Sequence, residues 1–363
     1  MKTIRIFALP SHQSLERTSG VDFARIIQPA RHLNGYKDVD TKFVVHVYDP
    51  RKHKTLDWLD VASKHDIIFF NYTAMSWEFA KMGLMARKFN RLLIMDVDDL
   101  IWGILPDNPV YEAFKKGSEN LHNFTAICNE VDYITTTNKY LRNAISHNTD
   151  KSVSEIGVFP NYIDLDNLYT HRSPFKDTAD IRLMHFGSTS HFIDLQSEEF
   201  ERGIDMIMKE YPNVTLKTVG ALIPKYKYRW GQRYENSYGH QDLYKWVGER
   251  MPGFMDEADI IVTPLDDNIY NRCKSSIKYL EASSAVKPGV WSNIRQYNEA
   301  VNHGTNGFLA TTASGWYESI KKLIEDKKLR KSMAENAFET VENTHQMKDN
   351  IKLYADFFKS VLS

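Results

Sequence analysis

Hydrophobic and polar positions along the chain follow two alternating patterns. Short runs of Ile, Val, Leu and Phe alternate with longer stretches in which apolar residues recur every three to four positions. The runs are typical of buried strands and the longer stretches of amphipathic helices, so their alternation predicts a parallel sheet with helical crossovers. In the first half, strands are expected at residues 3–9, 42–47, 66–70, 92–96, 133–136 and 154–159. Helices are expected at residues 22–33, 77–89, 111–126 and 139–146.

The pattern begins again after a polar connector at residues 164–180. Strands are expected at 181–186, 215–219, 260–263, 289–292 and 308–310. Helices are expected at 198–210, 241–251, 275–284, 294–301, 313–325 and 328–344, with a last amphipathic helix at 348–362. The two halves predict an α/β protein of two Rossmann-like domains facing each other across a cleft. Ligands bind beyond the carboxyl ends of such strands, so the chemistry is expected in the βα loops that line this cleft.

Composition narrows the class of protein. The 363 residues are 42% hydrophobic, which gives room for two domains with sizeable cores. Lys and Arg number 46 against 47 Asp and Glu, a balance that argues against nucleic-acid binding through bulk charge. The two cysteines, Cys128 and Cys273, form no metal or disulfide pattern. No apolar run approaches the roughly 20 residues that span a bilayer, and no signal-peptide core is visible. We expect a cytoplasmic protein of a bacterium or of a phage-infected host.

The segment at residues 259–281 is the most informative for chemistry. An apolar strand is followed by a polar loop and by a helix that is expected to begin near Ser275. On that helix Lys274, Lys278 and Glu281 share one side. A phosphate at the helix N-terminus would relieve the repulsion between the lysines and would use the free amides and the helix dipole. Glu281 is suited to accept two hydrogen bonds from a ribose diol. The alternative is a solvated helix face with a Lys278–Glu281 pair.

This segment resembles the C-terminal signature of the retaining, group 1 glycosyltransferases of GT-B fold, especially a short phage and bacterial branch. The matching residues are Pro264, Leu265, Asp267, Asn271, Lys274, Ser275, Lys278 and Glu281. The resemblance implies a nucleoside diphosphate sugar as donor substrate, with no cofactor and no metal. It implies that Asp267, Asn271, Ser275 and Glu281 bind the donor and that Lys274 and Lys278 are catalytic. Cys273 stands where the broader family has a glutamate near the donor sugar, so Asp267 or Asn271 is expected to substitute for it.

Two further loops match the same family. Gly187, Ser188 and His191 follow the first strand of the second half, where a tight turn lets backbone amides approach a phosphate. The alternative there is an ordinary turn with a solvated His191. In the first half Gly20 and Arg25 occupy the positions of a glycine loop that contacts the donor phosphate in the family. Arg25 could equally be a surface residue of its helix.

The acidic run at residues 96–102 allows two interpretations. Asp96 and Asp98 form the D-x-D pattern that binds a metal and a sugar diphosphate in GT-A enzymes. The GT-B-like branch instead carries an acidic segment here, matched by Asp98, Asp99 and Trp102. We interpret the run as a part of the cleft, with a catalytic Asp98, acceptor-binding Asp99 and Trp102, and no metal. The alternative is acidic capping of a βα loop.

The resemblance also implies a division of the chain. The first, acceptor-binding domain is expected to comprise residues 1–172 and 346–363, with a hinge near 159–169 and a last helix that crosses back. The second, donor-binding domain is expected at residues 173–345. One segment fits no family pattern, because residues 225–234 interleave cations with aromatics. Such a strip could stack on bases or sugars, or it could be a solvated loop.

These features together predict a glycosyltransferase that moves a hexosyl or pentosyl group from a nucleoside diphosphate sugar to a hydroxyl acceptor. The acceptor is either a glycan or cell-surface polymer, or a hydroxymethylated base of phage DNA. A non-catalytic sugar-nucleotide-binding protein is the remaining alternative. A two-domain oxidoreductase is disfavoured, since no expected strand is followed by G-x-G-x-x-G.

Overall fold

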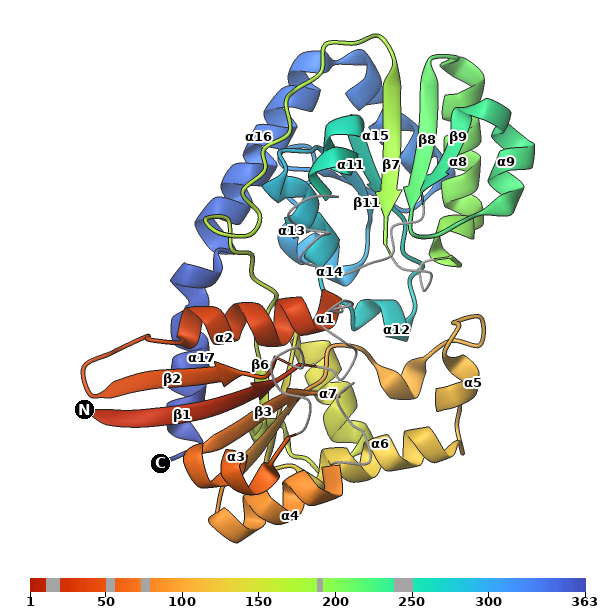
Figure 1. Cartoon of the computed structure of the whole chain (residues 1–363). Helices are drawn as coiled ribbons and strands as arrows, with labels where there is room; N and C mark the ends of the chain where they lie inside the picture. Colours follow the sequence, from red (N-terminus) through yellow and green to blue (C-terminus); the bar gives the residue numbers. More distant parts are fainter. Residues whose placement is uncertain (11–19, 50–55, 73–78, 188–191, 238–250) are drawn as a thin grey trace.

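The structure, a computed structural model, describes residues 1–10, 20–49, 56–72, 79–187, 192–237 and 251–363. These residues form two parallel sheets flanked by helices, and the two units face each other (Figure 1). This arrangement confirms the predicted GT-B fold. No helix within the described ranges is long and apolar enough to cross a membrane.

The first sheet has the strand order β2-β1-β3-β4-β5-β6, and all its pairings are parallel. All five residues of its central strand β3 are buried, as expected where helices cover both faces of a parallel sheet. The strands are β1 (Lys2–Leu9), β2 (Thr41–Val47), β3 (Ile67–Asn71), β4 (Leu92–Asp96), β5 (Tyr133–Thr136) and β6 (Ile156–Val158). The helices are α1 (Gly20–Asp22), η2 (Phe23–Ile27), α2 (Gln28–Leu33), α3 (Trp58–Lys64), α4 (Phe79–Phe89), η4 (Ile101–Gly103), α5 (Tyr111–Phe114), α6 (Glu119–Glu130), α7 (Lys139–Asn148) and η5 (Val153–Glu155).

The second sheet has the strand order β12-β11-β10-β7-β8-β9 and is also parallel throughout. Its strands are β7 (Ile181–Phe186), β8 (Val214–Val219), β9 (Tyr234–Ser237), β10 (Ile260–Thr263), β11 (Gly289–Ser292) and β12 (Phe308–Ala310). Its helices are η7 (Asp194–Gln196), α8 (Glu198–Glu210), α9 (Pro224–Trp230), η8 (Gly231–Arg233), α11 (Met251–Glu257), α12 (Ile269–Arg272), α13 (Ile277–Ser284), α14 (Arg295–Ala300), α15 (Ala313–Glu325) and α16 (Lys327–Thr344).

The last helix, α17 (Met347–Ser360), returns to the first sheet (Figure 1). It packs against α2, and its apolar face joins the core on that side of the sheet. Tyr354 stacks on Phe159 with ring centroids 4.4 Å apart, and Phe358 meets Phe69 edge-on at 5.5 Å. The predicted crossing of the C-terminal helix is therefore confirmed.

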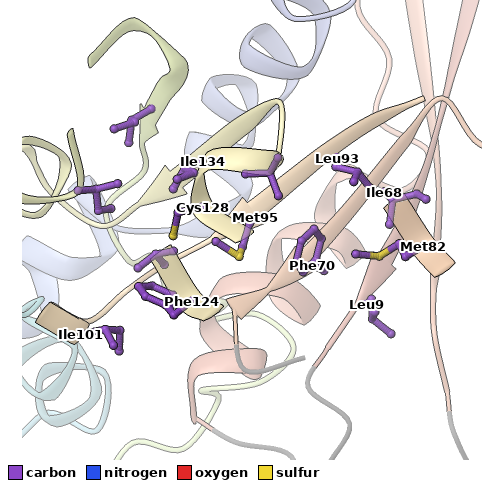
Figure 2. Packing of buried hydrophobic residues seen from close by; sticks show 14 of the residues in the cluster. Leu9, Ile68, Phe70, Met82, Leu93, Met95, Ile101, Phe124, Cys128 and Ile134 are labelled. Carbon is purple, nitrogen blue, oxygen red and sulfur yellow. The ribbon is translucent and has the colours of Figure 1, made fainter. Parts of the chain in front are cut away.

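The other face of the first sheet is closed by a larger apolar cluster (Figure 2). Ile68, Phe70 and Met95 contribute from strands, while Phe124 and Cys128 come from α6. Two residues of the second domain, Tyr270 and Cys273, also belong to this cluster. The two domains are thus joined by apolar packing at the start of the loop that precedes α13.

Several elements differ from the expectations. The helix expected at 111–126 is split into α5, which ends at Phe114, and α6, which begins at Glu119; Gly117, with a φ of +85°, lies in the turn between them. Ser118 then caps α6 through a bond from the Leu121 amide. The helix expected at 22–33 contains a π-helical segment, η2. The polar edge strand β9 and the short helix α3 were not predicted. The helix expected at 241–251 falls almost entirely outside the described residues.

The strip at residues 225–234 is not a stacking surface. Tyr226, Trp230 and Tyr234 are buried in the core of the second domain, and Tyr228 is the one exposed aromatic of the strip. Its cations are also engaged, since Arg229 pairs with Asp205. The hypothesis that this strip stacks on bases is therefore wrong. Tyr226 and Tyr234, four positions before and after Trp230, serve the core here.

Candidate functional site

The loop between β10 and α13 carries most of the predicted donor residues. Asn268 caps the short helix α12 by accepting a hydrogen bond from the Asn271 amide at 2.8 Å. α13 begins at Ile277, with Ser276 at its N-cap, so it starts two residues after the expected start at Ser275. Lys274 therefore lies in the loop, three residues before the first residue of α13. Lys278 lies in the first turn of the helix.

Lys274 sits between the two domains. Its ammonium lies 3.6 Å from Asp99 Oδ1 and 4.6 Å from the centre of the Tyr270 ring. Burial alone would lower the pKa of Lys274, but the neighbouring carboxylates, Asp99 foremost, outweigh it and raise the pKa above its usual value. Lys274 therefore carries a fixed positive charge, and its side chain is only 14% exposed.

Lys278 and Glu281 lie together on one side of α13, as predicted. Burial lowers the pKa of Lys278 to about 8, against the opposing effect of Glu281. Burial raises the pKa of Glu281 to about 7, although Lys278 and a 3.4 Å hydrogen bond from the Tyr169 hydroxyl favour its charged form. Both side chains are half-buried, so this side of α13 is not the fully solvated helix face of the alternative.

Asn271 is tied into the loop rather than presented to open space. Its side-chain amide donates to Asp194 Oδ1 at 2.7 Å and to the Asp266 carbonyl at 3.0 Å. Burial raises the pKa of Asp194, and burial together with Asp194 raises the pKa of Asp266 to about 6. Asp267 instead forms a surface pair with Arg272, at 2.6 and 2.8 Å. The geometry therefore gives Asn271 and Asp267 structural partners and brings an acidic pair, Asp194 and Asp266, beside the loop.

Cys273, at the position of the family glutamate, faces the first domain. It is 1% exposed and packs in the apolar cluster that holds Tyr270. Burial raises the pKa of its thiol to about 11, so the thiol stays neutral. The position that carries a glutamate elsewhere is part of the interface between the domains here.

Arg25 occupies a different place from the one predicted. Its guanidinium makes a two-point ion pair with Asp96, with Nε–Oδ1 at 3.0 Å and Nη2–Oδ2 at 2.9 Å. Its remaining nitrogen donates to the Phe159 carbonyl and to Asn161 Oδ1. Asp96 also accepts from the Thr135 hydroxyl at 2.6 Å. The structure thus gives Arg25 a buried structural role and corrects both its assignment as a donor ligand and the surface alternative.

The rest of the acidic run lies beside Lys274. Asp98 is half-buried, and its buried Oδ1 atom has no hydrogen-bond partner among the described residues. Burial, followed by the charges of Asp99 and Asp96, raises the pKa of Asp98 well above its usual value. Trp102 is directed elsewhere, because its indole donates to Thr125 at 2.9 Å and packs on the Phe124 ring. The geometry supports Asp98 and Asp99 as cleft residues, whereas it places Trp102 in the core of the first domain.

The glycine loops are described only in part. Gly187 ends β7, and its amide donates to the Val219 carbonyl at 3.0 Å. Gly220 must lack a side chain here, since a Cβ would lie 2.0 Å from the Gly187 carbonyl oxygen. Gly20 opens α1 at an exposed position. Ser188 and His191 lie outside the described residues.

Two asparagines of the first domain reach this loop and were not predicted. Asn138 follows β5 and donates to the Cys273 carbonyl at 2.7 Å, while Asn161 follows β6 and donates to Ser275 Oγ at 2.7 Å. Both occupy the carboxyl edge of the first sheet, where ligands of parallel sheets gather. A search for polar residues directly after the predicted strands would have found them.

Comparison with known proteins agrees with this geometry. Residues 192–326 match the model of a family described as Glycosyl transferases group 1. No curated protein matches the chain in sequence. The solved structure of Anabaena Alr3699/HepE with UDP and glucose aligns with a TM-score of 0.65 at 16% identity, covering 98% of this chain and 99% of that one.

Two other solved structures share the same architecture. Sucrose-phosphate synthase from Thermosynechococcus elongatus aligns with a TM-score of 0.63 at 13% identity, covering 100% of this chain and 99% of that one. A glycosyltransferase from Rickettsia africae aligns with a TM-score of 0.58 at 12% identity over the same shares. At these identities the likeness shows the fold. The fold is therefore GT-B, and within it residues 192–326 match the group 1 glycosyltransferases.

Proposed function

We propose that this glycosyltransferase moves a sugar from a nucleoside diphosphate sugar to a hydroxyl acceptor, with retention of configuration and without a metal. The observation that carries the proposal is the half-buried group of Lys274, Lys278 and Glu281 around the start of α13. Two lysines and the helix N-terminus supply positive potential for a diphosphate, and Glu281 supplies acceptors for the ribose. Ser275 lies in the same loop, between the two lysines.

Uridine diphosphate sugars are the donors to test first. The similar Alr3699/HepE structure was solved with UDP-glucose, as well as with UDP and glucose. We propose the same class of donor here, bound by the second domain at residues 173–345. The first domain, residues 1–172 with 346–363, would then hold the acceptor near Asp98 and Asp99.

The chemistry that this arrangement supports is electrostatic. The bond between the anomeric carbon and the diphosphate oxygen breaks, and the acceptor oxygen forms the new bond on the same face of the sugar. The acceptor proton passes to the departing phosphate oxygen. Lys274 and Lys278 stabilise the charge that develops on the leaving group, which is the charge that a transferase site must bind more tightly in the transition state. Asp98, whose Oδ1 atom is buried without a hydrogen-bond partner among the described residues, would hydrogen-bond to a sugar hydroxyl.

In the alternative D-x-D metal site, one of the two carboxylates is already occupied by other protein groups. Both oxygens of Asp96 are engaged by Arg25, and one of them by Thr135 as well. A hard divalent cation needs open carboxylate oxygens. The geometry therefore favours stabilisation of the diphosphate by lysines over stabilisation by a metal held at Asp96 and Asp98.

We propose a glycan or another polyhydroxyl polymer as the acceptor. The strip at 225–234 is a reason to consider modified DNA, but three of its four aromatics, Tyr226, Trp230 and Tyr234, are buried. The phage branch finds no support in the comparisons either. Incubation with labelled UDP sugars and either glycan acceptors or hydroxymethylated DNA would separate the two acceptors. Transfer to DNA alone would reverse this choice, and absence of both transfer and donor hydrolysis would favour a non-catalytic binding protein.

A further inference from the structure

The backbone of the loop at residues 271–275, called the donor loop below, is held by side chains along its whole length. Four successive carbonyl oxygens, from Asn271 to Lys274, each accept a side-chain hydrogen bond. These bonds are Gln296 Nε2 to Asn271 O at 3.0 Å, Arg295 Nε to Arg272 O at 2.7 Å, Asn138 Nδ2 to Cys273 O at 2.7 Å and Arg295 Nη2 to Lys274 O at 2.7 Å. Ser275 Oγ accepts a fifth bond, from Asn161.

The five bonds come from both domains. Gln296 and Arg295 belong to α14 of the second domain, so their bonds move with the loop. Asn138 and Asn161 belong to the first domain and contact the residues on either side of Lys274. A cavity of about 410 Å³ lies here and is lined from both domains. The two asparagines therefore line an open space beside Ser275, while Cys273 packs in the apolar cluster on the other side of the loop.

The fixed backbone matters because a lysine is a flexible ligand. Its ammonium ends a four-carbon stem and carries considerable rotamer entropy, so its position depends on where the backbone directs the Cα–Cβ bond. The carbonyl before Lys274 is fixed by Asn138, and the carbonyl of Lys274 itself by Arg295. The third constraint is Asp99 of the first domain, 3.6 Å from the ammonium.

We propose that Asn138 and Asn161 are positioning residues for Lys274, which fix the donor loop when the two domains are closed. The inference rests on the proposed function. Opening of the cleft would remove both asparagine bonds and the contact with Asp99 together. Lys274 would then be presented to the diphosphate only in the closed arrangement, so that tight donor binding and closure are coupled through two side-chain amides.

Each asparagine also has a local role that uses its other side-chain atom. Asn138 Oδ1 caps α7 by accepting from the Leu141 amide at 3.0 Å, and Asn161 Oδ1 accepts from Arg25. The bridging bonds use the Nδ2 atoms. Serine is also a good N-cap residue but is too short to bridge and has no amide, so Asn138→Ser separates the two roles. Asn138→Asp is a second variant, nearly equal in shape, that keeps the capping oxygen and loses the donor.

The test is a thermodynamic cycle with UDP as the probe. UDP affinity is measured by calorimetry for wild type, Asn138→Ser, Lys274→Ala and the double variant, with thermal unfolding as a check on folding. Asn138→Ser should weaken UDP binding roughly threefold to tenfold, the usual effect of one hydrogen bond. In the Lys274→Ala background the same change should have no further effect, because Asn138 acts through Lys274. Asn148→Ser, at the other end of α7, is the matched control and should bind UDP like wild type.

Each other outcome has a definite meaning. Equal weakening by Asn138→Ser with and without Lys274 would overturn the inference, since that effect would be structural. Wild-type affinity in both Asn138 variants together with a strong loss in Lys274→Ala would also overturn it, and would leave the proposed function standing. Wild-type affinity in Lys274→Ala itself would instead refute the donor site.

Discussion

Arg25 and Asp96 form a two-point ion pair in which each side chain is only 1% exposed. The pair joins η2 to the end of β4, and the same guanidinium reaches the Phe159 carbonyl at the segment predicted as the hinge. Opposite charges at this depth attract strongly, yet each has also lost its water, so the pair as a whole contributes little to stability. Its main consequence is that neither partner can be removed alone without leaving a buried charge.

Asp96→Asn should therefore destabilise the protein by about 3–5 kcal/mol, because the guanidinium of Arg25 keeps its charge without a counterion. Urea unfolding, followed by tryptophan fluorescence, measures the change. The matched control is Asp98→Asn, two residues away. Burial already raises the pKa of Asp98 well above its usual value, so an amide here removes a charge that its surroundings disfavour. That control should change stability by less than about 1 kcal/mol. Equal losses in both variants would contradict this account of the run.

Sugar transfer should continue in excess EDTA at more than half of its untreated rate. The reason is that Arg25 and Thr135 take up the oxygens of Asp96 that a metal would need. Initial rates with labelled donor, measured with EDTA and again with added Mn²⁺, provide the measurement. Transfer that requires Mn²⁺ in the wild type, and that is lost in Asp98→Asn, would support a metal site at residues 96–98.

Most of the fold could be predicted because its sheets are parallel. Strands buried on both faces have short, continuous apolar runs, and β4, β5, β7 and β10 have the predicted bounds. The elements that were not predicted have no distinctive sequence pattern. β9 is an edge strand whose sequence is polar after its first residue, and the π-helical turn η2 has no periodicity that differs from an α-helix over five residues.

The candidate site was predicted less fully than the fold. Lys278 and Glu281 follow from helical spacing, which is a local property, whereas Lys274 lies in the loop before the helix and not on it as expected. Whether Arg25 faces a ligand or Asp96 depends on two segments 71 residues apart, and sequence spacing carries no information on that distance. Buried structural arginines and ligand-binding arginines look alike in a single sequence. The bridges from the first domain were missed for the same reason.

Lys274→Ala should lower kcat roughly 10²–10³-fold, the usual cost of removing one group that stabilises charge in a transition state. The variant should fold, because the loop backbone keeps its hydrogen bonds to Asn138 and Arg295. Steady-state transfer and thermal unfolding are measured together. The matched control is Lys331→Ala, which removes an exposed lysine of α16 that pairs with Glu335, and it should retain wild-type kcat. Wild-type turnover in a well-folded Lys274→Ala would refute the proposed role.

UDP affinity should be highest between about pH 7 and pH 8. The pKa of Glu281 is raised to about 7, so below that value the carboxyl gains a proton and loses an acceptor for the ribose diol. The pKa of Lys278 is lowered to about 8, so above that value the free site loses a positive charge that the diphosphate needs. Each limb should approach a tenfold loss of affinity per pH unit, as expected when one proton is linked to binding.

Two variants assign the limbs of this profile. Glu281→Gln should abolish the loss on the acidic side, because the amide does not titrate, and Lys278→Met should abolish the loss on the alkaline side. Calorimetric titrations of UDP from pH 6 to pH 9 give the measurement. The UDP phosphate also ionises in this range, but its contribution is the same for all variants and cancels when they are compared. A profile that is unchanged in both variants would mean that the pair on α13 does not contact the nucleotide. A third result is possible, in which Glu281→Gln loses the acidic limb but Lys278→Met keeps the alkaline limb. That result would support the ribose contact of Glu281 and would assign the phosphate contact to Lys274 alone.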